Sequence, residues 1–168
     1  MTNDGKGREI MIKRMLPIAA GLCVLAVIGM AAALVFGGKA ESYSPPPFDP
    51  AAQAGTPQPP QDVGYGEIDA KAFSFSVAGE LTAENGKTDV WLTNPAKNTV
   101  WLKVRILDEQ DAVLGESGLI RPGEYVQAVK LDTVPRSTAN VSLKIMAYEP
   151  ETYYSAGSAR LKTVLTVA

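Results

Sequence analysis

The chain has 168 residues, of which 46% are hydrophobic and 20% charged, and its formal net charge is -2. The length fits one domain with attached segments, and the composition excludes a wholly disordered chain and a strongly basic nucleic-acid-binding domain. The sequence has no histidine and a single cysteine, Cys23, which excludes a Ser-His-Asp triad, a histidine-ligated metal and an internal disulfide. We therefore expect neither enzyme activity nor a cofactor.

The first predicted element is a membrane-spanning helix. No charged residue occurs from position 15 to position 36, and as a helix this run reaches about 33 Å, which matches the hydrocarbon core of a bilayer. Basic residues gather before the run, namely Lys6, Arg8, Lys13 and Arg14. The positive-inside rule then predicts a cytoplasmic tail at 1–14, a transmembrane helix at 15–38 and an extracytoplasmic remainder.

Two alternatives concern how this helix is used. A signal peptide cleaved after Ala40 has suitable small residues, but its apolar region is normally 7–15 residues long, so we expect an uncleaved anchor. Cys23 follows Leu22 rather than a small residue, and we interpret it as a packing residue within the bilayer. Small residues recur at every fourth position, a pattern that also allows a homo-oligomer through Gly29, Ala33 and Gly37.

The next segment, 39–66, is predicted to be an extracytoplasmic spacer. It is rich in proline, at positions 45, 46, 47, 50, 57, 59 and 60. Each proline fixes φ and removes a backbone donor, so neither a helix nor a central strand is expected. An extended chain of this composition holds a domain away from the membrane.

Residues 67–168 are predicted to form an all-β domain. Hydrophobic residues alternate with polar ones, and turn residues such as Asn85-Gly86 and Pro122-Gly123 separate the runs. The expected strands are 73–77, 89–93, 100–106, 112–117, 125–131, 141–147 and 160–167. About seven short strands with regular turns indicate an immunoglobulin-like antiparallel β-sandwich.

Several of these segments resemble a known class of proteins. The resemblance rests on four segments: Thr93-Asn94-Pro95, 100–107, 117–123 and 141–148. Together with the layout of the chain, they resemble small single-pass membrane-anchored envelope proteins of Gram-positive bacteria, which have one immunoglobulin- or fibronectin-III-like domain outside the cell. The resemblance implies a fold and a location, and it implies no catalytic residue.

The main candidate site is a basic, aromatic sheet face. The polar sides of the strands 100–106, 141–147 and 160–167 carry Trp101, Lys103, Arg105, Lys144, Met146, Tyr148, Arg160 and Lys162. These strands are neighbours in an immunoglobulin-like sheet, so their outward side chains are expected to form one surface. Such a surface fits an anionic polymer, a lipid headgroup or a partner protein. The alternative is a solvated face in which long basic side chains cover the sheet.

A second candidate is the loop that contains Tyr153 and Tyr154, which either contact a partner or fold back on the core. Carboxylates also gather in turns, at Asp108-Glu109-Asp111 and at Glu149 and Glu151, and we interpret them as solvated charges rather than as a catalytic pair or a calcium site.

The sequence therefore predicts a membrane-tethered, non-enzymatic interaction or accessory module of the cell envelope. Its partners would be the bilayer, through 15–38, and an envelope protein or anionic polymer. The alternatives are a structural subunit that assembles laterally and, less favoured, an envelope enzyme.

Overall fold

The computed structural model of the protein describes residues 43–168. The predicted tail, the transmembrane helix with Cys23, and the small-residue pattern at Gly29, Ala33 and Gly37 lie outside the described residues. Within 43–168, no helix is both long enough and apolar enough to cross a bilayer.

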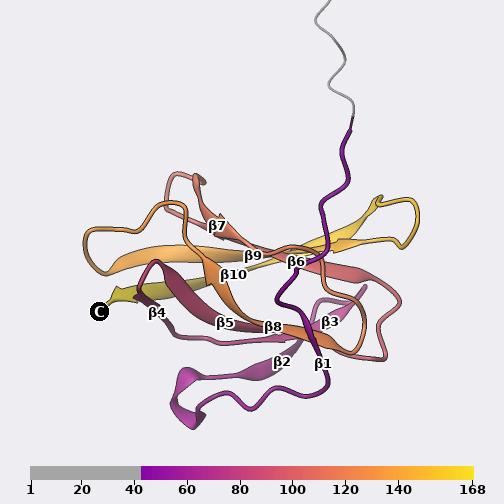
Figure 1. Cartoon of the computed structure of the whole chain (residues 1–168), viewed down its shortest axis with the longest axis horizontal. Helices are drawn as coiled ribbons and strands as arrows, with labels where there is room; N and C mark the ends of the chain where they lie inside the picture. Colours follow the sequence, from indigo (N-terminus) through magenta and orange to yellow (C-terminus); the bar gives the residue numbers. More distant parts are fainter. Residues whose placement is uncertain (1–42) are drawn as a thin grey trace, which may run out of the picture. The chain divides into compact units, whose positions relative to one another are not determined.

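Residues 45–168 make up a unit built on one ten-stranded, curled β-sheet, a half-barrel (Figure 1). Its elements are β1 (Gln53–Ala54), the 3-10 helix η1 (Gln61–Val63), β2 (Gly66–Asp69), β3 (Ser74–Val77), β4 (Leu81–Glu84), β5 (Lys87–Asn94), β6 (Trp101–Leu107), β7 (Val113–Glu116), β8 (Glu124–Lys130), β9 (Ala139–Tyr148) and β10 (Ser155–Val167). The strands follow the order β1-β8-β5-β4-β10-β9-β6-β7, while β3 pairs with β5 and with β2. The prediction of an all-β fold is confirmed.

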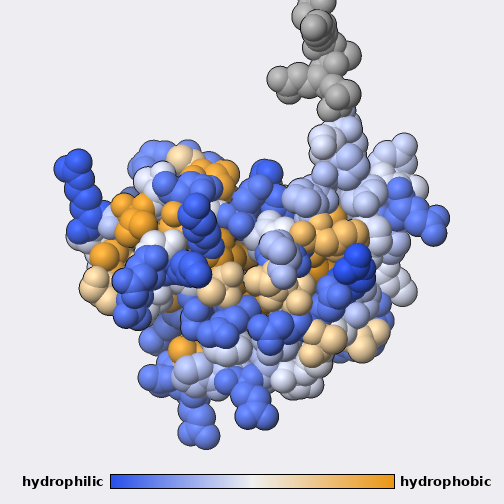
Figure 2. Space-filling model, in the orientation of Figure 1, coloured by the Kyte–Doolittle hydropathy of each residue, from blue (hydrophilic) through white to orange (hydrophobic). Residues whose placement is uncertain are grey.

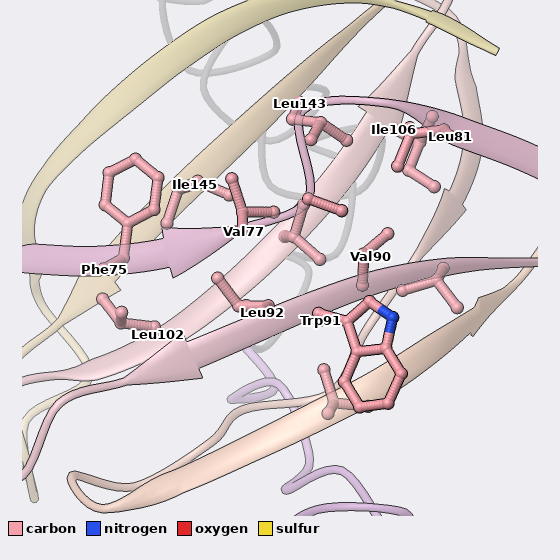
Figure 3. Close-up of a cluster of buried hydrophobic side chains, with 14 of the residues drawn as sticks. Phe75, Val77, Leu81, Val90, Trp91, Leu92, Leu102, Ile106, Leu143 and Ile145 are labelled. Carbon is pink, nitrogen blue, oxygen red and sulfur yellow. The ribbon is translucent and has the colours of Figure 1, made fainter. Parts of the chain in front are cut away.

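The curl brings the inner sides of the strands together around a hydrophobic core. The surface displayed in Figure 2 is mainly hydrophilic, with hydrophobic side chains in small separate patches. Inside, Leu102 of β6 and Ile145 of β9 face Phe75 of β3 and Leu92 of β5 (Figure 3), and all four are fully buried. Burying such side chains is the main favourable term in folding.

The predicted turns join the strands as expected. Asn85 and Gly86 have φ of 51° and 74°, the positive values that a type I′ hairpin between β4 and β5 requires. The Pro122-Gly123 turn has φ of 80° at Gly123, and it is closed by the Glu124 amide, which donates to the Arg121 carbonyl at 3.0 Å.

The structure differs from the prediction in strand number and in one pairing. Three short strands were not predicted: β1, β2 and β4. Because β4 pairs with β10 in parallel, from Leu81↔Leu165 onward, the sheet is not wholly antiparallel. The predicted neighbourhood of β6, β9 and β10 is correct, since β9 pairs with β6 on one side and with β10 on the other.

The proline-rich stretch does not extend as a free spacer up to position 66. The unit that contains the sheet begins at Pro45. Pro57 is buried, Ala52, Val63 and Tyr65 pack against the core, and β1 pairs with β8. Proline prevents regular structure but not packing, so residues 45–66 lie against the sheet and the predicted boundary at 66 must move toward the N-terminus.

Gly118 is the residue that lets this segment dock. A Cβ atom at Gly118 would lie 2.4 Å from the Asp49 amide nitrogen. Around this approach, the Asp49 amide donates to the Leu119 carbonyl at 2.9 Å, and the Gly118 amide donates to Asp49 Oδ2 at 2.7 Å. Only glycine allows the two backbones to come this close.

Gly118→Ala should therefore lower the free energy of unfolding by about 2 kcal/mol, because Asp49 must move and lose these hydrogen bonds. Urea unfolding of the full-length protein in detergent measures the effect. Gly66→Ala is the control, since nothing lies within 4 Å of a Cβ at that position. Equal stability of the two variants would contradict docking of the segment.

Candidate functional site

The candidate site is the outer face of β6, β9 and β10, which we call the basic face. The register across these strands places Arg105 opposite Lys144, and Lys144 opposite Arg160. Residues directly opposite each other on one face have Cβ atoms about 4.5–5.5 Å apart. Three cations therefore stand in one row across three strands, and Lys162 lies two residues farther along β10.

Carboxylates stand at both ends of this row. On β7, Glu116 is opposite Arg105, and its Oε2 accepts a hydrogen bond from Arg105 Nε at 2.6 Å. At the other end, the guanidinium of Arg160 forms an ion pair with Asp111. Lys144, in the middle, forms no ion pair with any residue of 43–168. Its ammonium is the least neutralised charge of the row.

The cations lower the pKa values of the two carboxyl groups at the ends of the row. The hydrogen bond from Arg160 is the main cause that holds the pKa of Asp111 below its ordinary value. For Glu116, partial burial raises the pKa, but hydrogen bonds from Lys103 and Arg105 outweigh that effect and lower it. Both carboxyl groups are therefore charged at neutral pH. Their negative charges reduce the repulsion between the cations of the row.

Lys103 is not part of the accessible surface, although the sequence placed it there. The residue is only 4% exposed, and its Nζ lies 2.6 Å from Glu116 Oε1. Its register partner Met146 is also buried. Lys103 thus helps to hold Glu116 in place and is not available to a large partner.

The aromatic residues of the prediction gather at the start of β6. The ring of Trp101 meets Tyr153 at 5.1 Å and Phe48 at 4.8 Å, both edge to face. The guanidinium of Arg121 lies 3.6 Å from the centre of the Phe48 ring. Edge-to-face contacts of this kind stabilise packing, so Trp101 and Tyr153 hold the β9–β10 loop against β6.

The other predicted aromatic residues lie nearby in different environments. Tyr148 is opposite Trp101 in the register and is half-buried, with its hydroxyl 3.7 Å from the Met146 sulfur. Tyr154 is 72% exposed, the most exposed large hydrophobic side chain among residues 43–168. Of the two loop tyrosines, Tyr153 packs inward and Tyr154 faces solvent.

A groove of about 650 Å³ adjoins the basic face at the far end from the aromatic residues. Arg160 and Lys162 line it on one side, and Asp108, Glu109 and Asp111 line it on the other. Asp108 Oδ1 accepts the backbone amides of Gln110 and Ala112 at 2.9 and 2.8 Å, so this carboxylate shapes its own turn.

The structure therefore brings together Arg105, Lys144, Arg160 and Lys162 as an accessible group and separates them from Lys103 and Met146, which are buried. The sequence analysis missed two residues that shape this face, Glu116 and Phe48. Glu116 carries a weak signal, since it lies on the polar side of a strand next to the basic one. Phe48 carries none, because it lies in a proline-rich stretch predicted to be a spacer.

No protein-family model matches the chain, and a search of curated proteins finds no similar one.

Proposed function

We propose that the protein is a non-enzymatic interaction module of the cell envelope. In this proposal a single-pass helix at 15–38 anchors the chain with its N-terminus inside, and residues 45–168 dock a negatively charged partner protein or anionic polymer outside. The resemblance to membrane-anchored envelope proteins of Gram-positive bacteria supports this location. So does the uncharged run from position 15 to position 36.

We assign the curled sheet to the immunoglobulin-like sandwiches. The pairings β4-β5-β8 and β6-β9-β10 correspond to the two strand groups A-B-E and C-F-G of that fold. In such domains a sheet often presents its outer face to a partner, while the inner face of the same sheet packs in the core. The basic face belongs to the second group.

The observation that carries the proposal is the row Arg105, Lys144 and Arg160. Like charges directly opposite one another on a sheet are unfavourable, and here three of them occur in register on a chain whose net charge is -2. An anionic partner relieves this repulsion. Lys144, which has no carboxylate within ion-pair distance among residues 43–168, gains most from such a partner.

Binding of fluorescent poly-L-glutamate to the full-length protein in detergent tests this function. We expect Lys144→Gln/Lys162→Gln to weaken binding about 3- to 10-fold, because each surface charge contributes a fraction of a kcal/mol to about 1 kcal/mol. The matched control is Lys87→Gln/Lys130→Gln, which removes two exposed charges that face each other on β5 and β8. It should change affinity less than twofold.

Two results would contradict the proposal. Poly-L-glutamate that binds no better than neutral dextran would show that the face does not select anions. An equal loss in the two double variants would show that only the net charge of the protein matters and not the row on β6, β9 and β10. Raising the salt concentration should weaken the wild-type interaction, since exposed charges are screened.

A further inference from the structure

One edge of β10 is unpaired next to the basic face. β10 pairs with β9 from Ser155 to Leu165, but on its other side it pairs with β4 only from Leu165 to Val167. The Ala168 amide donates to the Ala83 carbonyl, on the β4 side, at 3.1 Å. Alternate residues of a strand direct their backbone groups to the same side. The N–H and C=O groups of Ser158, Arg160 and Lys162 therefore point away from β9, and within residues 43–168 no backbone partner meets them.

A groove runs along this edge. It has a volume of about 190 Å³ and lies between β10 and β2, with Leu161 on one side and Gly66 and Ile68 on the other. Thr163 Oγ1 donates to the carbonyl of Gly79, a residue of the turn between β3 and β4 that also lines the groove. Gly66 carries no side chain and Ile68 is partly buried, so the groove has a small, largely apolar floor.

The charges beside the edge decide what can pair with it. Arg160 and Lys162 are exposed on the outer side, and Lys144 lies next to Arg160 on β9. A second copy of β10 in this position would set these cations against their own copies, which disfavours pairing between two copies. A strand with carboxylates on the same face would instead place each of them about 5 Å from a cation.

We propose that this edge binds an extended acidic segment of a partner protein, which adds to the sheet as a strand beside β10. The inference rests on the proposed function in one respect, the negative charge of the partner. Backbone hydrogen bonds to Ser158, Arg160 and Lys162 supply affinity, and side chains supply specificity. The segment has acidic residues at every second position, facing outward with Arg160 and Lys162, and small apolar residues between them, facing Leu161 and Ile68.

A capped seven-residue peptide of alternating Glu and Val is the probe, labelled with a fluorophore and mixed with the full-length protein in detergent. The first control peptide has the same composition with the four glutamates in one block. The second is N-methylated at every residue, so it keeps the charges and the apolar side chains but loses all backbone donors, including those of the glutamates opposite Arg160 and Lys162. We expect the alternating peptide to bind about tenfold more tightly than either control, the equivalent of one to two backbone hydrogen bonds.

Two substitutions at one position separate the contribution of a backbone hydrogen bond to peptide affinity from the contribution of the side-chain charge. The Lys162 amide points away from β9, so Lys162→Pro removes a donor at the open edge and leaves the β9 pairing intact. Lys162→Gln removes the charge and keeps the donor. We expect about a tenfold loss of peptide affinity for Lys162→Pro and about a threefold loss for Lys162→Gln. In hydrogen exchange, the peptide should protect the Arg160 and Lys162 amides.

The outcomes separate this inference from the proposed function. Equal losses in Lys162→Pro and Lys162→Gln, or equal binding of the alternating and block peptides, would overturn strand addition while leaving anion binding in place. Binding of poly-L-glutamate without binding of the alternating peptide would have the same meaning and would favour a polymer. Failure of both probes would overturn both proposals. If Lys162→Pro unfolds, the N-methylated peptide on the wild-type protein decides the question alone.

Discussion

Replacing Glu116 with glutamine should lower the free energy of unfolding by about 2–3 kcal/mol, because it leaves the Lys103 ammonium buried without a carboxylate. Removing one partner of a fully buried ion pair costs more than this. Glu116 is 36% exposed, however, so water reaches the pair and reduces the loss. Urea unfolding of the full-length protein in detergent measures the change.

Two further variants test the cause. Adding Lys103→Met to Glu116→Gln should restore most of the lost stability, since an apolar side chain of similar length needs no partner in a buried position. Glu67→Gln breaks an ion pair with Lys97 in which both side chains are exposed, and it should leave the free energy of unfolding nearly unchanged. If Lys103→Met fails to rescue Glu116→Gln, the buried ammonium is not the source of the loss.

The effect of Glu116 should depend on pH. In the folded protein its pKa lies below the ordinary value of 4.5: burial raises it, and the hydrogen bonds from Lys103 and Arg105 lower it by more. The unfolded chain therefore takes up the proton first as the pH falls. The stabilisation by Glu116 is complete at neutral pH and is lost as the pH drops below about 4.5, so wild type and Glu116→Gln should converge in acid.

Hydrophobic periodicity was enough to predict to which side of the sheet the residues of β6 and β9 point. Strict alternation in 100–106 and 141–147 assigns Arg105 and Lys144 to the outside and Val104 and Ile145 to the core, and the structure agrees at all four positions. A period of two determines the face of a side chain whatever the pairing of the strand. The turn at Asn85-Gly86 was also predictable, because its conformation depends on residues that are neighbours in the sequence.

Features that depend on distant partners were not predictable in this way. Lys103 follows the same alternation as Arg105, yet Glu116 on β7 and the neighbouring side chains bury it. The β4–β10 pairing joins residues more than eighty positions apart and leaves no local signal. Composition was misleading for residues 45–66. Proline content describes the stiffness of a chain, whereas the docking of Asp49 depends on a glycine at 118.

This distinction also bears on the edge of β10. The sequence predicted a strand at 160–167, and the structure begins it at Ser155, well before the point where β4 joins. Because β4 pairs with β10 only from Leu165 onward, Ser158, Arg160 and Lys162 are left unpaired on one side. The open edge thus arises from a mismatch in the lengths of neighbouring strands, which pattern alone does not reveal.

The largest loss of stability is expected for Asn94→Asp, about 4 kcal/mol at pH 7. Asn94 is fully buried at the end of β5. Its Nδ2 donates to the carbonyls of Val100 and Ile120 at 2.8 and 3.1 Å, and its Oδ1 accepts from Asn98 Nδ2 at 2.7 Å. Aspartate has the same shape, but its carboxylate has no donor for either carbonyl, so the substitution buries a charge facing two oxygens.

The sign of the pH dependence separates this mechanism from a packing defect. Burial next to two carbonyl oxygens raises the pKa of the new carboxyl above its unfolded value of about 3.9, so the folded protein binds the proton more tightly. The penalty should therefore grow as the pH rises from about 4 and shrink in acid, because the new carboxylate destabilises the fold when it is ionised, whereas ionised Glu116 stabilises it. Asn85→Asp, in the exposed type I′ turn, is the isosteric control and should be neutral. A penalty at position 94 that does not change between pH 4 and pH 7 would rule out a buried charge as its cause.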